Sequence, residues 1–159
     1  MSFDDWVLAL HVLSAFAFVA GIVLFWILIV AVRKTALPEA RVSIESVVRV
    51  GNAAVAIGSV GTIVFGLWLT FSIGGYNIWD GWIVAALVLW VVANAVGRRT
   101  GEAYTRGASK ARELQAAGRS GPSDELLALN RTSQGVLMHF LTSLAVVLLL
   151  IDMIWKPGA

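Results

Sequence analysis

The sequence contains no cysteine and has few charged residues. Because none of its 159 residues is cysteine, disulfides and thiolate metal sites are excluded. Only 14% of the residues are charged, whereas 58% are hydrophobic, and the mean hydropathy is +0.82. A soluble domain of this length cannot hide that much apolar surface in one core. The composition therefore predicts an integral membrane protein.

Motifs of soluble enzymes are also missing. The sequence has no glycine-rich phosphate-binding loop, no cluster of metal ligands and no nucleophile–base pair at a recognisable spacing. These absences favour a role other than catalysis, and we predict no catalytic residue.

Four apolar runs are each long enough to cross a hydrocarbon layer about 30 Å thick, which takes about 20 helical residues. They cover residues 6–32, 50–71, 80–97 and 135–155. The first run is interpreted as a retained helix, because Asp4 and Asp5 stand where a signal peptide carries positive charge. We predict an all-α fold, an antiparallel four-helix membrane bundle that forms a single transmembrane domain over residues 1–159.

Basic residues are concentrated in two of the connecting segments. Of the 12 lysines and arginines, four lie between the first two runs and seven between the last two, which leaves only Lys156 on the other side. The positive-inside bias then places both long loops in the cytoplasm and both termini outside. Acidic residues are interspersed with the basic ones, so the charge indicates attraction to anionic lipid and not to nucleic acid. Five tryptophans mark the outer interface: Trp6, Trp68, Trp79, Trp82 and Trp155.

The cytoplasmic segments are predicted to be helical extensions of the bundle. Pro38 suits the first turn of the second helix. In residues 98–134 the third helix is expected to continue until Gly118, and Ser123 or Asp124 to cap a fourth helix that starts in water. Such a hairpin projects by roughly 20 Å at 1.5 Å per residue. The alternative is a surface loop with nascent helix.

Small residues recur along the second apolar run. The stripe consists of Gly58, Thr62, Gly66 and Thr70, spaced by four, with Gly61 beside it. Small side chains let helix backbones approach closely, so we predict helix packing through Gly58, Gly61, Thr62 and Gly66. The alternative is that the glycines make room for a flat cofactor.

Two histidines lie within apolar runs, one near each membrane surface. By depth, His11 is level with Asp152, Met153 and Thr70, whereas His139 forms a second polar cluster with Asn52 and Asn94. Their separation argues against one iron bridged by both histidines. Polar groups inside a membrane are costly unless they are paired, and they are candidates for function. The alternative for each is a structural hydrogen bond, for His11 one to Asp152.

Two stretches carry a resemblance to known bacterial membrane proteins. The first stretch is LHVLSAFAFVAG, residues 10–21, which contains His11. It resembles the first helix of the copper-resistance-D-like and membrane-bound protoporphyrinogen-oxidase-like proteins. DMIWKPG, residues 152–158, is similar to the ending of a related bacterial four-helix family with no assigned function. The resemblance implies a bacterial plasma membrane protein.

The resemblance also implies what can be expected of His11. In the oxidase relatives the early histidine serves a haem-dependent reaction together with an intramembrane lysine on a later helix, and the third run here has no lysine. Oxidase activity is therefore not expected. Copper transport is disfavoured as well, because the soft ligands are limited to Met1, Met138 and Met153. What the resemblance leaves is haem binding, electron transfer or a structural role.

Three functions remain for comparison with the structure. In the first, His11 is the axial ligand of a b-type haem iron in an electron-transfer protein, with Met153 or a second protomer's histidine opposite. The candidate haem-binding residues are His11, Met153, Phe18, Ser14 and Thr70. In the second, the chain is an accessory subunit of a larger membrane complex or a homo-oligomer, packed through the small-residue stripe and the basic hairpin. Transport along the polar groups is the weakest, since no acidic residue lies at mid-membrane.

Overall fold

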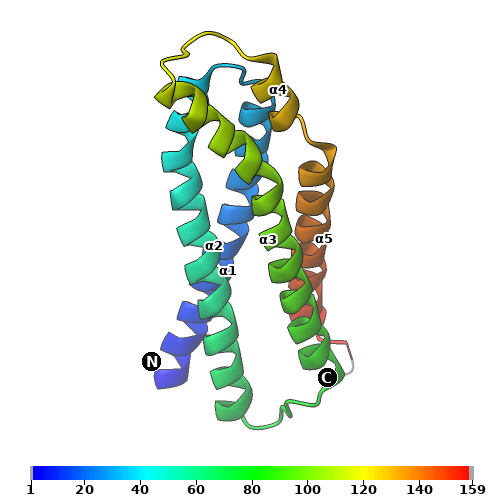
Figure 1. Ribbon diagram of the computed structural model, residues 1–159. Coiled ribbons are helices and arrows are strands. Elements are labelled where there is room, and N and C mark those ends of the chain that lie inside the picture. The colour runs from blue at the N-terminus through cyan, green and yellow to red at the C-terminus, as the bar shows by residue number, and fades with distance from the viewer. Residues whose placement is uncertain (1, 158–159) are drawn as a thin grey trace.

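The computed structural model describes residues 2–157, and in that range it is built of helices without strands (Figure 1). Met1 and Gly158, which entered the sequence argument, lie outside the described residues. The helices are α1 (Phe3–Arg33), α2 (Pro38–Ser72), α3 (Gly81–Ala116), α4 (Asp124–Asn130) and α5 (Ser133–Trp155). Four helical segments are long and apolar enough to span a membrane. The prediction of an all-α membrane bundle is confirmed.

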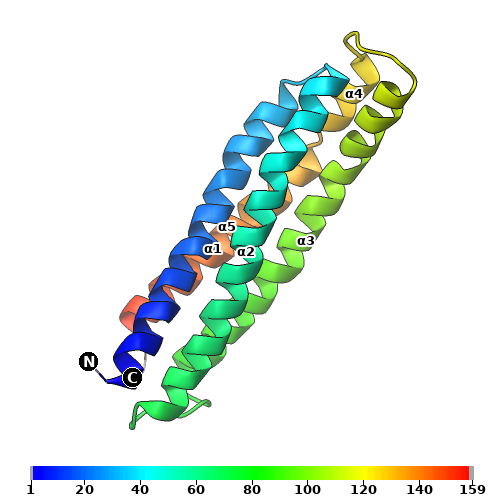
Figure 2. The same cartoon turned by 90° about the vertical axis from the view of Figure 1, so that its left-hand side faces the viewer.

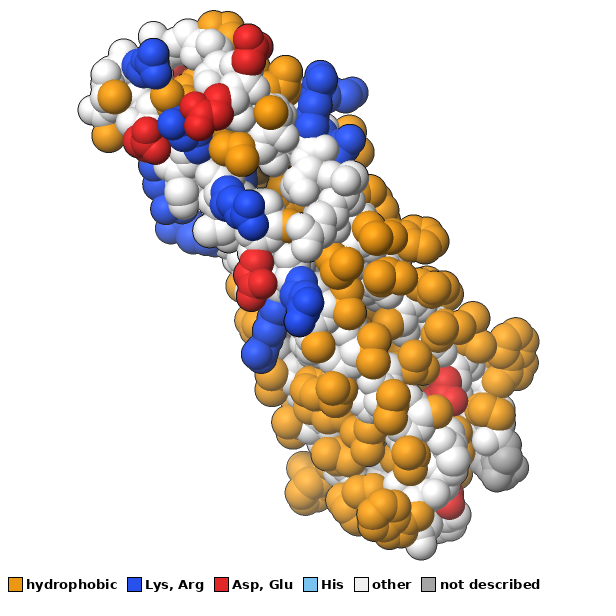
Figure 3. All heavy atoms as spheres, turned by 45° about the vertical axis from the view of Figure 1, so that its right-hand side comes forward, with side chains coloured by type: hydrophobic (Ala, Val, Ile, Leu, Met, Phe, Trp, Pro, Cys, Tyr) orange, Lys and Arg blue, Asp and Glu red, His pale blue; other side chains and the backbone are white. Residues whose placement is uncertain are grey.

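The long helices run antiparallel along one axis, and both chain ends lie at the same end of the bundle (Figures 1 and 2). We call this the terminal end. The opposite end carries α4 and most of the charged side chains, and we call it the basic end (Figure 3). Between them, large apolar side chains cover the surface, among them Phe16, Ile57 and Phe140. Such a surface is stable in lipid and costly in water.

The first turns of the helices explain several polar residues. Ser2 accepts a hydrogen bond from the Asp5 backbone N–H at 3.2 Å, and its own N–H donates to the Asp5 carboxylate, which completes a capping box. The acidic residues before the first apolar run therefore cap a helix. Pro38 is in the first turn of α2, and the Ser123 side chain accepts from the Leu126 N–H at the start of α4.

The helices associate as two closely packed pairs, α1 with α2 and α3 with α5. At Gly58 a Cβ atom would overlap the Phe18 and Ser14 backbone of α1, and at Gly61 it would overlap the Ser14 side chain. Thr62, in the same stripe, is buried. The small-residue stripe thus faces α1 within the chain, so it is not free to contact another protein.

The α3–α5 pair also packs through glycine, in this case against a side chain near the basic end. A Cβ at Gly135 of α5 would lie 2.5 Å from the Tyr104 ring of α3. Nearer the middle of the bundle, Gly97 lies close to Thr142, whose methyl carbon would be 3.7 Å from an added Cβ. Both pairs therefore depend on glycine where the helices meet.

The boundary between the two pairs, which we call the seam, is held together differently. Trp26 of α1 donates to the Ser143 hydroxyl of α5 at 2.9 Å, and Ser59 of α2 donates to Asn94 of α3 at 3.0 Å. One apolar cluster crosses the seam: Phe18, Ile22, Ala93, Ala145 and Val146. Elsewhere the seam is open enough to contain two cavities.

The basic end is formed by the end of α3, the short helix α4 and a break that precedes α5. α3 ends at Ala116 and Gly118 follows with a φ of 70°, as the predicted stop requires. The returning arm is not one continuous helix, because α4 is short and a break precedes α5. At this break Arg33 Nη1 of α1 donates to the carbonyls of Arg131 and Thr132 at 3.0 and 3.1 Å. Carbonyls directed at α1 cannot continue a helix, so α4 and α5 are separate helices, and the cap predicted at Ser123 is present at the start of α4.

Candidate ligand cavities in the seam

The first cavity lies at the terminal end and has a volume of about 540 Å³, within the range of small-molecule sites. All four long helices line it, and most of the lining is apolar. Three residues that the sequence placed at one depth, His11, Thr70 and Met153, line this cavity together. We call it the terminal-end cavity.

His11 has a defined orientation in this cavity. Its Nδ1 lies 3.0 Å from the backbone carbonyl oxygen of Thr62 in α2. A carbonyl only accepts hydrogen bonds, so Nδ1 carries a proton, and in the neutral ring Nε2 presents a lone pair. Within residues 2–157 the hydrogen bond of the His11 ring is the one from Nδ1, so Nε2 remains available to a ligand. Gly66 admits the ring, because a Cβ there would lie 2.9 Å from its Cε1.

The polar neighbours expected for His11 make other contacts. The Thr70 hydroxyl donates to the Gly66 carbonyl at 3.0 Å, within its own helix. Asp152 is buried, and its Oδ2 has no hydrogen-bond partner within the described part of the chain. The hydrogen bond from His11 to Asp152, the structural alternative for this histidine, is therefore not formed.

Two of the candidate haem-binding residues lie elsewhere. Ser14 donates to the Leu10 carbonyl at 2.7 Å and packs on Gly61, at the α1–α2 contact. Phe18 is only 3% exposed and belongs to the apolar cluster that crosses the seam. It is seven residues from His11, or roughly 10 Å along the helix. Neither side chain lines the terminal-end cavity, so the predicted set reduces to His11, Thr70 and Met153.

Lys156 completes the mouth of this cavity, which the sequence did not suggest. Its Nζ donates to the Tyr76 hydroxyl at 3.1 Å and lies 4.7 Å from the Tyr76 ring centroid and 5.2 Å from that of Trp82. Trp82, expected at the outer interface, is 6% exposed and lines the cavity instead. The left-handed backbone of Lys156, with a φ of 42°, ends α5. The only signal in the sequence was that Lys156 is the sole basic residue at this end.

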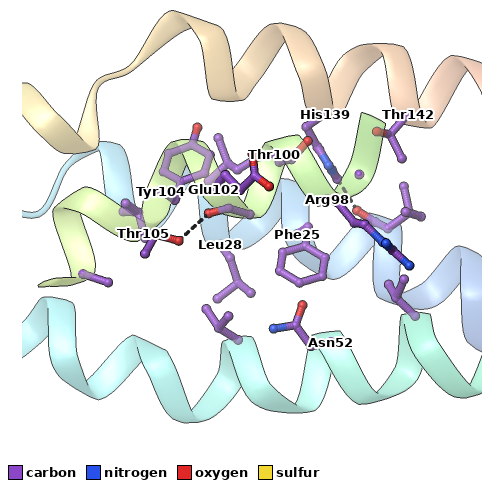
Figure 4. A pocket seen from close by; sticks show the side chains of 18 of the residues that line it. Phe25, Leu28, Asn52, Arg98, Thr100, Glu102, Tyr104, Thr105, His139 and Thr142 are labelled. Carbon is purple, nitrogen blue, oxygen red and sulfur yellow. Dashed lines mark hydrogen bonds between the residues drawn. The ribbon is translucent and has the colours of Figure 1, made fainter. Parts of the chain in front are cut away.

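The second cavity lies toward the basic end and has a volume of about 960 Å³. Figure 4 shows His139 from α5, Asn52 from α2 and Arg98 from α3 around it. The second polar cluster of the sequence, His139, Asn52 and Asn94, therefore shares one cavity. We call it the basic-end cavity.

Two members of this polar cluster, His139 and Asn94, hydrogen-bond to backbone carbonyls and to Ser59, not to each other. His139 Nε2 donates to the Ile22 carbonyl of α1 at 3.1 Å, and its ring meets the Trp26 ring edge-on at 4.8 Å. Asn94 donates to the Trp90 carbonyl at 2.9 Å and accepts from Ser59. The bonds from His139 to the Ile22 carbonyl and from Ser59 to Asn94 tie helices together across the seam, which is the structural role considered for this histidine and this asparagine.

Arginines line the basic-end cavity, and sequence reasoning had treated them only as topology signals. Arg41 is 3% exposed, with Nε 3.4 Å from Asn130 Oδ1 and Nη2 3.3 Å from the Tyr104 carbonyl. Its Nη1 is buried without a hydrogen-bond partner in the described structure. Burial lowers the pKa of Arg41. The negative charge of Glu45 raises this pKa in part, and the positive charge of Arg112 lowers it further. Arginine nevertheless stays charged in proteins.

The described residues contain no group of three His, Cys, Asp or Glu side chains that would hold a bare metal ion. A metal held within a larger prosthetic group needs only one or two axial ligands from the protein. His11 with Met153 is a pair of that kind, and both line the terminal-end cavity.

Comparison with known proteins assigns the chain to a family but gives no characterised relative. No curated protein and no solved structure matches the chain significantly. The resemblance to copper-resistance-D-like and protoporphyrinogen-oxidase-like proteins gains no support from these comparisons. A family described as predicted integral membrane protein matches residues 5–157, nearly the whole chain. The chain therefore belongs to this family of integral membrane proteins, DUF2269.

Proposed function

We propose that this protein binds a b-type haem in the terminal-end cavity, with His11 Nε2 as an axial ligand, and that it serves electron transfer in a bacterial plasma membrane. The observation that carries the proposal is the hydrogen bond from His11 Nδ1 to the Thr62 carbonyl. Histidines that bind metal usually donate their other N–H to a carbonyl or carboxylate, which fixes the tautomer and the ring. His11 has that arrangement, and its free nitrogen is in an apolar cavity.

Other features of the cavity suit the size and chemistry of a haem. The volume of about 540 Å³ is that of a small-molecule site, and Met153, which lines it, would offer a thioether as a second ligand to the iron. Haem is apolar over most of its surface but carries carboxylates at one edge, and Lys156 at the mouth of the cavity supplies a positive charge for them. A haem iron provides reversible one-electron transfer when it is bound.

The proposed electron transfer depends on which membrane face the cavity approaches. The excess of basic residues at one end favours an orientation with the basic end in the cytoplasm and the terminal-end cavity near the outer surface. We expect a cysteine introduced at Ser2 to react with an impermeant maleimide on intact cells, and one at Ser109 to react only after lysis. If Ser109→Cys is labelled on intact cells, the basic end faces outward and the proposed orientation is wrong.

The haem proposal is tested by the visible absorption spectrum of the protein purified from haem-producing cells. The wild type should show a Soret band, and His11→Ala should lose it while keeping its helical content. His139→Ala is the matched control, because that histidine also lies within the bundle but donates its Nε2 to a carbonyl. A Soret band that survives His11→Ala, or a colourless wild type, would contradict haem binding at His11.

A further inference from the structure

The basic-end cavity has sides of different character. Its deep part is lined by apolar side chains of α1, such as Phe18, Ile22 and Phe25. Along α1 the lining continues to Val32, which lies roughly 21 Å from Phe18 at 1.5 Å per residue. Opposite this apolar face of α1, the helices α2 and α3 contribute arginines and glutamates to the lining. The cavity is therefore amphipathic, with its apolar part inside the bundle.

The charged part of the cavity has an excess of positive charge. Four arginines and two glutamates line it: Arg41, Arg49, Arg98, Arg112, Glu45 and Glu102. One of the two glutamates is already neutralised, because Arg112 contacts both Glu45 carboxylate oxygens at 2.9 to 3.2 Å. An anion that enters the cavity therefore meets arginines that are not all paired.

Arg41 indicates where an anion would bind. Its guanidinium is buried, its two hydrogen bonds are long, and Nη1 has no partner within residues 2–157. A buried charge without full hydrogen bonding is costly, and an anion in the adjoining cavity would relieve that cost. Arg98 projects at the same cavity from α3 (Figure 4). Tyr104, whose carbonyl contacts Arg41, lies six residues beyond Arg98 on α3, toward the basic end.

We propose that the basic-end cavity binds an anionic phospholipid, with its phosphate at the arginines of the lining, among them Arg41 and Arg98, and an acyl chain along the apolar side chains of α1 such as Phe25 and Phe18. Guanidinium groups bind phosphate oxygens through paired, charge-assisted hydrogen bonds. Basic pockets between transmembrane helices are sites for anionic headgroups. A free phosphate ion accounts for the arginines but leaves the apolar length of the cavity without an occupant, so a lipid is the better fit. This site is separate from the terminal-end cavity.

The test is native mass spectrometry of the purified protein in detergent, titrated with dioleoyl phosphatidylglycerol, dioleoyl phosphatidylcholine or inorganic phosphate. We expect a one-to-one complex with phosphatidylglycerol, at least tenfold weaker binding of phosphatidylcholine, and no displacement of phosphatidylglycerol by millimolar phosphate. Displacement by phosphate would show that the site takes free anions, and equal binding of both lipids would show that the arginines do not recognise the headgroup. Either result overturns the proposal.

Matched variants locate the site. Arg98→Gln should weaken phosphatidylglycerol binding about tenfold, whereas Arg99→Gln should leave it unchanged, because both residues are exposed neighbours on α3 and only Arg98 lines the cavity. Arg41→Gln should weaken binding at least as much. Because Arg41 is buried, its loss can destabilise the fold. The decisive comparison is therefore between Arg98→Gln and Arg99→Gln. An equal loss at both positions would indicate general surface attraction and contradict the proposal.

Discussion

The interfaces within the two helix pairs differ from the seam between the pairs. Inside the α1–α2 pair, glycine brings backbones into contact, and no room is left even for one added carbon at Gly58. At the seam, side chains such as Trp26 and His139 reach across to hydrogen-bond partners, and two cavities of about 540 and 960 Å³ remain. Tight pairs thus supply the rigidity, and the seam supplies the space for ligands.

The two cavities of the seam differ in turn because the helices change composition along their length. At the terminal end the lining residues of α2 and α3 are largely apolar, apart from Thr62 and Thr70, and His11 of α1 and Lys156 after α5 add two ionisable groups. At the basic end the same two helices extend past their apolar segments and present arginine and glutamate. One seam therefore provides one site suited to an apolar cofactor and another suited to an anionic headgroup.

The largest effect is expected from a change inside a pair. Gly58→Leu should prevent folding or lower the free energy of unfolding by about 3 kcal/mol or more, because the new side chain meets α1 backbone that has no space to move. The measurement is the yield of monodisperse protein in detergent and its thermal unfolding by circular dichroism. Val64→Leu, on an exposed position of α2, is the control. Similar melting of the two variants would mean that the α1–α2 contact is not tight.

A change at the seam should cost less. His139→Phe keeps an aromatic ring beside Trp26 but removes the hydrogen bond to the Ile22 carbonyl. We expect a loss of about 1 kcal/mol, the typical net value of one such bond. Thermal unfolding measures it, and Phe140→Leu on the exposed side of α5 is the control. A loss as large as that of Gly58→Leu would remove the distinction between seam and pairs.

The smallest effect is expected at the mouth of the terminal-end cavity. Lys156→Gln should weaken haem binding by a factor of about 1.4 to 5, because a partly exposed ion pair contributes roughly 0.2–1 kcal/mol. Haem titration of apoprotein measures the change, with Lys34→Gln at the basic end as the control. An unchanged affinity in Lys156→Gln would mean that the haem carboxylates do not meet this lysine.

Most of the fold follows from local sequence patterns. The apolar runs give the four spans, Pro38 gives the start of α2, and Gly118 gives the end of the α3 extension, since each depends on neighbours in the chain. The break between α4 and α5 could not be predicted in this way. It depends on Arg33, which lies 98 residues before the carbonyl of Arg131 that it binds.

The sequence predicted which residues of the candidate site lie at the same depth in the membrane, but not which side chains face the cavity. Counting residues from the membrane surfaces placed His11 with Thr70 and Met153, and these do share a cavity. Ser14 was also predicted to bind the haem, but its side chain packs on Gly61 at the close α1–α2 contact. The arginines of the basic-end cavity were missed because helix pairing, and with it the position of the seam, is not encoded in the periodicity of any one helix.

The central claim, that His11 Nε2 is a free ligand in the seam, is tested most directly by chemical rescue. His11→Gly should purify without a Soret band when haem is present, and added imidazole should restore the band, because the small molecule replaces the lost ring beside Gly66. Imidazole should not change the spectrum of the wild type. If His11→Gly keeps its Soret band without imidazole, or if neither protein ever binds haem, His11 is not a haem ligand and the account of the terminal-end cavity is wrong.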